Sequence, residues 1–325
     1  MAKRPSLDDR LAELRRLRDR DPSPELTEEL RKAIGDRSNL IAATAADIAG
    51  ERTITELANA LEAAFTRFMA DPLKNDKLCR AKIAIVKALD RMEHGAEDVF
   101  LAAAKHIQRE PVWGGTEDTA APLRAAAILA LTRTNAIGLM TILVESLVDP
   151  EKDVRAAAAQ ALGAVGSEAA TLLLRLKIRV GDGEPEVLSE CFSGILACDP
   201  AAGPDIVREY LASGHMPTLE AAALALGRSR LPGAYEALRE RWQQPILPLP
   251  VKETLLLALG MLRLPVATDF LLDVVADEPV PVALGALTGL HIQAHDPRLR
   301  SRIEEVVARR KAPELLARFA RDFSA

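Results

Sequence analysis

The feature of this sequence that most limits its fold is a pattern that recurs about every thirty residues. An apolar residue followed by leucine marks the end of one predicted helix in each unit. The marking residues are Leu89, Leu131, Leu162, Leu196, Leu226, Leu259 and Leu290. Their successive spacings are 42, 31, 34, 30, 33 and 31 residues, and a weaker unit ends near Ile48. Repeats of this length indicate an array of small supersecondary units rather than one large core.

Each unit divides into two helices separated by glycine or proline. In the clearest unit, residues 149–180, the first helix carries an apolar stripe at helical spacing, formed by Val154, Ala157, Ala158, Ala161 and Leu162. Gly163 and Gly166 then end that helix, and a second helix rich in leucine follows. About thirty residues hold two helices of ~12 residues with their turns and leave no room for strands. The sequence therefore predicts an all-α fold, an α-solenoid of about eight helix hairpins.

The motif of the clearest unit resembles a known repeat family. Residues 149–163 read Asp-Pro-x-x-Asp-Val-Arg-x-x-Ala-x-x-Ala-Leu-Gly. This pattern resembles the bacterial HEAT repeat, including the type named after phycobilisome lyases, over residues 38–310. The resemblance implies second helices that line the concave side and an Asp/Arg ladder between repeats. The ladder position, seven residues before each marking leucine, holds Lys82, Arg124, Arg155, Ser189, Leu219, Lys252 and Ala283. We therefore expect a full ladder only near residues 124–155.

The two ends differ from the repeats. Residues 6–9 form a capping-box pattern, and Leu7, Leu11, Leu14 and Leu17 share one helical stripe. Another amphipathic helix starts at Pro313 and carries Leu315, Leu316, Phe319 and Phe323. Because the end of a solenoid exposes an apolar face, a polar-backed helix is expected to cover it. The sequence predicts a capping helix pair at 1–37, the repeat array at 38–310 and a capping helix at 311–325. A partner-binding or dimerising pair is the alternative for 1–37.

One unit is longer than the others and contains an insertion. Residues 110–118 read Glu-Pro-Val-Trp-Gly-Gly-Thr-Glu-Asp. We expect an extended loop between repeats. Insertions on one face of a solenoid often contact partners. Trp113 is therefore a candidate contact residue, and a tryptophan packed back over its own repeat is the alternative.

Composition narrows the class of protein. The net charge of −5 argues against a dedicated nucleic-acid binder. The N-terminal segment has no apolar core of a secretory signal, and no apolar run approaches the ~18 residues of a membrane span. The three cysteines form no Cys-x-x-Cys pair and are expected to be small buried side chains in a reducing cytoplasm. The excess of arginine over lysine and the many alanines suggest a bacterial source.

Several enzymes share this type of repeat, and their signatures are absent from the sequence. Deoxyhypusine hydroxylase holds iron with His-Glu pairs, whereas no histidine here precedes a glutamate. His291 and His295 are four residues apart and could share a metal on a helix, but the segment reads as a helix end, so we expect two turn histidines. Asp149, Glu151 and Asp153 are expected to be acids at a helix N-terminus rather than a calcium loop. The sequence predicts no catalytic residue, no metal and no cofactor.

The remaining candidate is a surface on the second helices. A modest basic stripe with aromatic neighbours is expected there, and an ordinary solvated face is the alternative. The candidate partner-binding residues are Arg175, Arg179, Arg208, Tyr235, Arg239, Trp242 and Trp113. Arginine forks match carboxylates well. We therefore expect a non-enzymatic, cytoplasmic scaffold that holds a protein or extended peptide on its concave face. Nucleic-acid binding through the arginines and a lyase-like enzyme or accessory subunit remain as alternatives.

Overall fold

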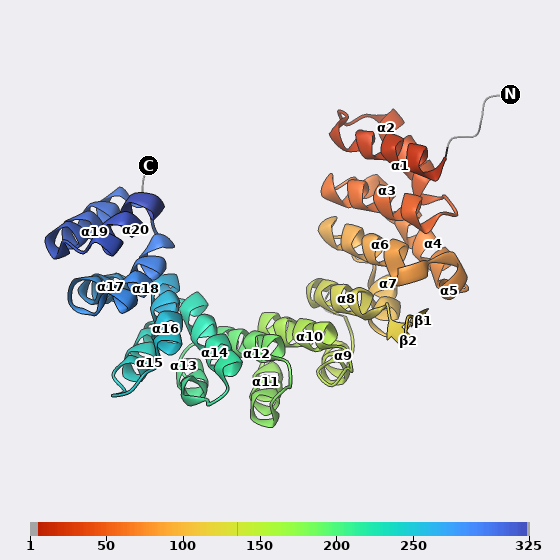
Figure 1. Ribbon diagram of the computed structural model, residues 1–325. Helices are drawn as coiled ribbons and strands as arrows, with labels where there is room; N and C mark the ends of the chain where they lie inside the picture. Colours follow the sequence, from red (N-terminus) through yellow and green to blue (C-terminus); the bar gives the residue numbers. More distant parts are fainter. Residues whose placement is uncertain (1–5, 135, 324–325) are drawn as a thin grey trace. The chain divides into compact units, whose positions relative to one another are not determined.

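The computed structural model describes residues 6–134 and 136–323, which form two compact units divided between Ala161 and Leu162 (Figure 1). The first unit contains α1 (Leu7–Arg16), α2 (Pro24–Ile34), α3 (Asn39–Glu51), α4 (Ala58–Met69), α5 (Pro72–Asn75), α6 (Arg80–Arg91), α7 (Glu97–Ala104), β1 (Arg109–Val112), β2 (Gly115–Asp118), α8 (Ala121–Thr134) and α9 (Leu139–Ser146). Short 3-10 turns are η1 (Leu17–Asp19), η2 (Thr55–Leu57) and η3 (Lys77–Cys79).

Helix α10 (Lys152–Val165) contains the division between the units. The second unit continues with α11 (Glu168–Val180), α12 (Pro185–Cys198), α13 (Gly203–Arg208), η4 (Glu209–Ala212), α14 (Met216–Ser229), α15 (Pro232–Trp242), α16 (Leu249–Leu262), α17 (Pro265–Asp277), α18 (Val280–His291), α19 (Pro297–Arg310) and α20 (Pro313–Asp322). Within the described residues the chain is thus a succession of antiparallel helix pairs, and the predicted all-α solenoid is confirmed. No helix of the described part is both long and apolar enough to span a membrane.

Small residues bring alternate helices of the second unit close together. A Cβ added to Gly163 would lie 2.8 Å from the Cα of Gly194, and one added to Gly227 would lie 2.6 Å from the carbonyl oxygen of Ala258. We call α12, α14, α16 and α18 the close-packed layer of this unit, and α11, α13, α15 and α17 its open layer. Because the close-packed helices are nearer to one another, this side of the unit is the shorter one, and it lies on the inside of the bend (Figure 1).

This arrangement corrects one expectation. The sequence analysis expected the second helix of each repeat to lie on the concave side. In the second unit these helices, α11, α13 and α15, lie on the outside of the bend instead (Figure 1). The reason is steric, because the glycine- and alanine-rich helices tolerate the closest approach. In the first unit α3, α6 and α8 form the corresponding close-packed layer, where a Cβ on Gly50 would lie 2.7 Å from the Cα of Ala88.

The prediction that the array has no room for strands is wrong at the insertion. β1 and β2 pair antiparallel, with Arg109 opposite Asp118 and Val112 opposite Gly115. The turn between them consists of Trp113 and Gly114, and Gly114 has a φ of +92°. Only the second turn residue has a positive φ, which glycine adopts without steric cost. Gly114 therefore allows the chain to reverse between the two strands.

The charged ladder departs from expectation in its extent. Arg124 pairs with Asp149 at 3.0 Å, as the ladder predicts, but Lys82 and Lys252 also keep carboxylate partners, Asp76 and Glu278, each at 3.6 Å. Leu219 and Ala283 are buried apolar side chains at the same position. The later repeats thus combine apolar packing with one surviving ion pair.

The terminal helices are amphipathic. Ser6 caps α1 in a complete capping box with Asp9, and Leu11, Leu14 and Leu17 are buried. Leu7 and Leu316, which the sequence placed on inward stripes, are exposed instead. Leu315 and Phe323 are buried. The end helices therefore present one apolar face to the neighbouring repeat and one polar face outward.

Candidate interaction surfaces

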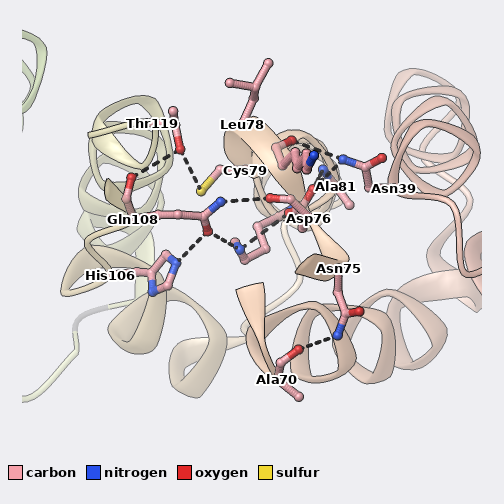
Figure 2. A network of polar contacts seen from close by, with 12 residues as sticks. Asn39, Ala70, Asn75, Asp76, Leu78, Cys79, Ala81, His106, Gln108 and Thr119 are labelled. Atoms are coloured by element: carbon pink, nitrogen blue, oxygen red, sulfur yellow. Dashed lines mark hydrogen bonds and ion pairs between the residues drawn. The ribbon is translucent and has the colours of Figure 1, made fainter. Parts of the chain in front are cut away.

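A buried polar network joins the base of the hairpin to the start of α6 (Figure 2). The side chains of Asp76 and Lys82 are both fully buried. Lys82 Nζ donates to Gln108 Oε1 at 2.8 Å and lies 3.6 Å from Asp76 Oδ2. Gln108 Nε2 donates to the carbonyl oxygen of Asp76 at 2.8 Å and to Glu110 Oε1 at 2.7 Å. An amide between a buried ammonium and two acceptors leaves few polar atoms unsatisfied, which is what burial demands.

The network holds a strained stretch of backbone. Leu78 and Cys79 have φ values of 61° and 51°, in the left-handed region that costs a non-glycine residue about 1–2 kcal/mol. The Leu78 N–H donates to Glu110 Oε1 at 2.6 Å. The N–H groups of Ala81 and Lys82 donate to the Asp76 carboxylate at 2.9 and 3.0 Å. These bonds at both ends of the strained pair stabilise the conformation and fix where α6 begins.

The second strand is tied to the next helix in the same way. Asp118 accepts from the N–H of Gln108 at 3.0 Å and from Arg124 at 2.7 Å. Burial by itself would raise the pKa of Asp118, but the hydrogen bonds from Gln108 and Arg124 outweigh it and lower that pKa. For Glu110 too, burial opposes the shift, and hydrogen bonds from Thr119, Gln108 and Leu78 lower the pKa. The carboxylates are therefore stabilised in their charged form.

This network supports the fold and offers no reactive group. Its charged atoms form hydrogen bonds and ion pairs within the network, and the side chains of Asp76 and Lys82 are fully buried. Burial raises the pKa of the Cys79 thiol to about 11, so little of the nucleophilic thiolate exists at neutral pH. The described residues contain no group of three or more side chains placed to hold a metal ion. The network therefore acts as a rigid base for the hairpin.

At the tip of the hairpin, Trp113 extends fully into solvent. Its relative exposure is 104%, and the preceding Val112 is 43% exposed. The alternative in which the tryptophan packs back over its own repeat is thus wrong. A two-residue turn holds the indole away from the helices, because the strand register places it beyond the last pair, Val112 and Gly115. A large apolar side chain on a rigid support is the kind of group that dominates protein interfaces.

The predicted basic stripe lies on α11, α13 and α15 of the second unit, but acidic neighbours neutralise most of it. Arg179 pairs with Glu209 at 3.0 Å, and Arg208 pairs with Glu240 at 2.8 Å. Each pair links one helix pair to the next. Arg175 is exposed and has no ion pair among the described residues. A continuous positive potential is therefore absent from the described part of this stripe.

Arg239 and Trp242 serve packing between helices. The Arg239 guanidinium lies 3.9 Å from the ring centre of Phe270, and Trp242 meets the same ring edge-on at 5.6 Å. Lys252 lies 5.1 Å from the centre of the Trp242 ring. These contacts join α15 to α16 and α17 through cation–π and aromatic interactions. Tyr235 is half-buried on the same helix. Sequence reasoning missed Phe270, which only the fold brings to these residues.

An exposed apolar stripe on α11 was also missed. Leu172, Leu176 and Val180 are four residues apart and therefore share one face of the helix. Their exposures are 59%, 59% and 75%. Arg175 and Arg179 lie beside this stripe on the same helix. The signal was present in the sequence as a second apolar stripe on a helix whose buried face is Ala170, Leu174 and Ile178.

The histidine pair does not form a site. Helix α18 ends at His291, so His295 lies in the turn beyond it and the two rings do not share a helical face. His291 instead meets Phe323 edge-on, with ring centres 5.4 Å apart. His295 thus lies in a turn, as expected, whereas His291 is the last residue of α18.

Stacked antiparallel helix pairs with close contacts between small residues define the class of α-solenoid repeat proteins. Within this class, residues 139–169 match the sequence model of the HEAT repeat. The match starts with α9 and continues through α10. The helix carrying Asp153-Val-Arg155 is therefore the second helix of its repeat, whereas the sequence analysis took it as the first. This shift of one helix explains why the expected concave helices lie on the other side.

Solved structures with similar folds are distant in sequence. YibA of Escherichia coli is 16% identical, covering 89% of this chain and 98% of its own, with a TM-score of 0.46. The CpcE–CpcF complex of phycocyanin lyase from Nostoc is 17% identical, covering 94% and 99%, with a TM-score of 0.39. Human deoxyhypusine hydroxylase is 18% identical, covering 80% and 91%, with a TM-score of 0.31. At these values the likenesses assign no activity or partner. No curated protein matches the chain.

Proposed function

We propose that this protein is a non-enzymatic interaction scaffold that binds a helical segment of another protein on the apolar stripe of α11. The observation that carries the proposal is the run of Leu172, Leu176 and Val180, each more than half exposed on one helical face. Soluble monomers seldom leave such contiguous apolar surface uncovered without a binding role. A second amphipathic helix is the partner element that fits a single apolar stripe.

The arginines beside the stripe indicate which charged groups the partner helix carries next to its apolar face. Arg175 is exposed and forms no ion pair among the described residues. Arg179 pairs with Glu209, and both of these side chains are exposed to solvent. A carboxylate on the partner helix can pair with Arg175 without displacing an existing bond. Arginine presents five donors in a planar fork that matches a carboxylate. The proposed partner is therefore a helix with leucine-like residues on one face and glutamate or aspartate at its edge.

Trp113 offers a second contact of the same kind in the first unit. The buried hydrogen bonds of Gln108 anchor the base of the hairpin that presents the indole. The scaffold proposal thus has two independent contact points, one in each unit.

The test is quantitative co-purification with single and paired variants. Tagged wild-type protein and the variant Leu172→Glu/Leu176→Glu are used to capture proteins from the source cells, and captured proteins are compared by mass spectrometry. Loss of the two apolar contacts is expected to reduce recovery of a specific partner at least about tenfold. Val266→Glu, at another exposed apolar side chain of the second unit, is the matched control and retains the partner.

Three outcomes contradict the proposal. The first is equal recovery by the α11 variant and the control. The second is self-association of the wild type that Leu176→Glu abolishes, which identifies the occupant as another copy of this chain. The third is turnover of a captured small molecule by the wild-type protein, which points to an enzyme. Trp113→Ala, assayed in parallel, measures the contribution of the hairpin separately.

A further inference from the structure

The close-packed layer of the first unit carries an open groove between α1, α3 and α6. Its floor is apolar and includes Leu11, Leu40 and Ile83, one from each helix. Leu11 is buried, whereas Leu40 and Ile83 are partly exposed to the groove. The groove therefore offers apolar surface that a bound chain could cover, within one unit.

Cations line this floor without partners of their own. Arg15 lies in the last turn of α1, and Arg80 and Lys87 lie on α6; all three are exposed lining residues. None of them forms an ion pair or hydrogen bond with a described residue. This differs from the second unit, where carboxylates of the next helix pair occupy Arg179 and Arg208. A group of unpaired cations beside apolar surface attracts a ligand that is both acidic and apolar.

Two acidic groups face the same region. Asp47 lies on the α3 wall, half-buried, and forms no hydrogen bond or ion pair within the described residues. Burial, with help from Glu51, raises the pKa of Asp47, while Arg91, Lys87 and Arg18 oppose the shift. Glu51 itself is paired with Arg18 at 2.8 Å. The cations therefore outnumber the unpaired carboxylate, and the groove keeps a net positive charge.

We propose that this groove binds an acidic amphipathic peptide segment of a partner protein. Its apolar side chains would cover Leu40 and Ile83, and its carboxylates would pair with Arg15, Arg80 and Lys87, away from Asp47. The site is separate from the α11 stripe in the other unit, so either proposal can fail while the other holds.

A nucleic acid fits the same groove less well. Asp47 would face phosphates, and none of the lining residues is aromatic, so bases would find no stacking platform. The net charge of −5 also opposes polyanion binding through long-range attraction. Carboxylates spaced along an apolar chain match the groove better because they use both its floor and its rim.

The experiment measures binding of labelled probes to the full chain by fluorescence anisotropy. The probes are a 12-residue peptide of alternating glutamate and leucine pairs, its glutamine-for-glutamate analogue, and a 12-nucleotide single strand of DNA. We expect the acidic peptide to bind at least about tenfold more tightly than the other two, because charged hydrogen bonds each contribute roughly a factor of ten. Its affinity is expected to fall as salt is raised.

Variants assign the binding to the groove. Arg80→Gln/Lys87→Gln is expected to weaken the acidic peptide about a hundredfold, at the same factor per charge. Lys74→Gln/Lys105→Gln, which removes the same charge from exposed positions outside the groove, leaves its affinity unchanged. Asp47→Asn strengthens binding severalfold, because an unpaired negative charge leaves the site. Thermal melts of each variant confirm that the fold is kept.

The inference is overturned if the groove variant binds like the control variant, or if the glutamine analogue binds as well as the acidic peptide. Tighter binding of the DNA strand that the groove variant abolishes also overturns it and assigns the groove to nucleic acid. An unchanged or weakened affinity for Asp47→Asn contradicts the placement of the carboxylates. Each of these results is independent of whether α11 captures a partner.

Discussion

At the scale of single residues, Lys82 shows how position and environment combine. Lys82 occupies the ladder position of its repeat, but its carboxylate partner Asp76 lies six residues earlier in the same unit and not in an adjacent repeat. No sequence pattern indicated that both side chains are fully buried or that Gln108 lies between the cation and Glu110. Those contacts come from a segment 26 residues further along the chain, which only the fold brings close. The position of the cation was thus readable from the repeat spacing, whereas its buried network was not.

Replacing Lys82 by methionine is expected to destabilise the protein by about 3 kcal/mol, because the buried Asp76 carboxylate loses its counter-charge. Urea unfolding followed by circular dichroism measures the change. Lys87→Met, at an exposed position on the same helix, is the control and should change stability by less than about 0.5 kcal/mol. Equal effects of the two substitutions contradict the role assigned to Lys82.

Glu110 gives the network a dependence on pH. Although burial opposes it, hydrogen bonds lower the folded pKa of Glu110, so its contribution is present above the unfolded pKa of about 4.3 and is lost as pH falls through the folded value. The urea midpoint of the wild type should therefore decrease from pH 5 to pH 3. Glu110→Gln is less stable at pH 7 and loses less on acidification. If the urea midpoint of Glu110→Gln decreases as much as that of the wild type between pH 5 and pH 3, Glu110 is not the source of the pH dependence.

At the scale of elements, the sequence predicted the helices well and the layers poorly. The breakers correctly placed the end of α10 before Gly166 and the start of α17 at Pro265, although α10 continues through Gly163 to Val165. Layer assignment instead depends on which helix approaches its neighbour most closely. That property follows from glycine and alanine facing one another across repeats. The hairpin was missed because its two four-residue strands contain one buried side chain, Glu110, and so lack an apolar alternation.

Gly227 tests the layer assignment. An alanine in a helix is normally favourable by up to about 1 kcal/mol, but a Cβ here would lie 2.6 Å from the carbonyl oxygen of Ala258. Gly227→Ala should therefore destabilise the protein by about 1–3 kcal/mol, the usual range for overpacking. At Gly35, where the nearest atom is 3.4 Å away, alanine should be neutral or stabilising. Thermal unfolding of both variants measures these changes. A Gly227→Ala variant that is more stable than the wild type would show that the close-packed layer can accommodate the added Cβ.

At the scale of the whole molecule, stability is expected to be local because each helix pair contacts mainly its neighbours. The Lys82→Met substitution should increase amide exchange in α5, α6, β1 and β2 and leave α14, α16 and α18 unchanged. Exchange measured by mass spectrometry on both proteins distinguishes this from a single cooperative core, in which protection would fall throughout the chain.

The account as a whole rests on partner binding at the exposed face of α11. Hydrogen exchange of the full chain, with and without the captured partner, tests that claim most directly. We predict that peptides covering residues 168–180 gain protection in the complex and that the gain disappears with Leu172→Glu/Leu176→Glu. Protection confined to other helices, with residues 168–180 unchanged, would contradict the central proposal.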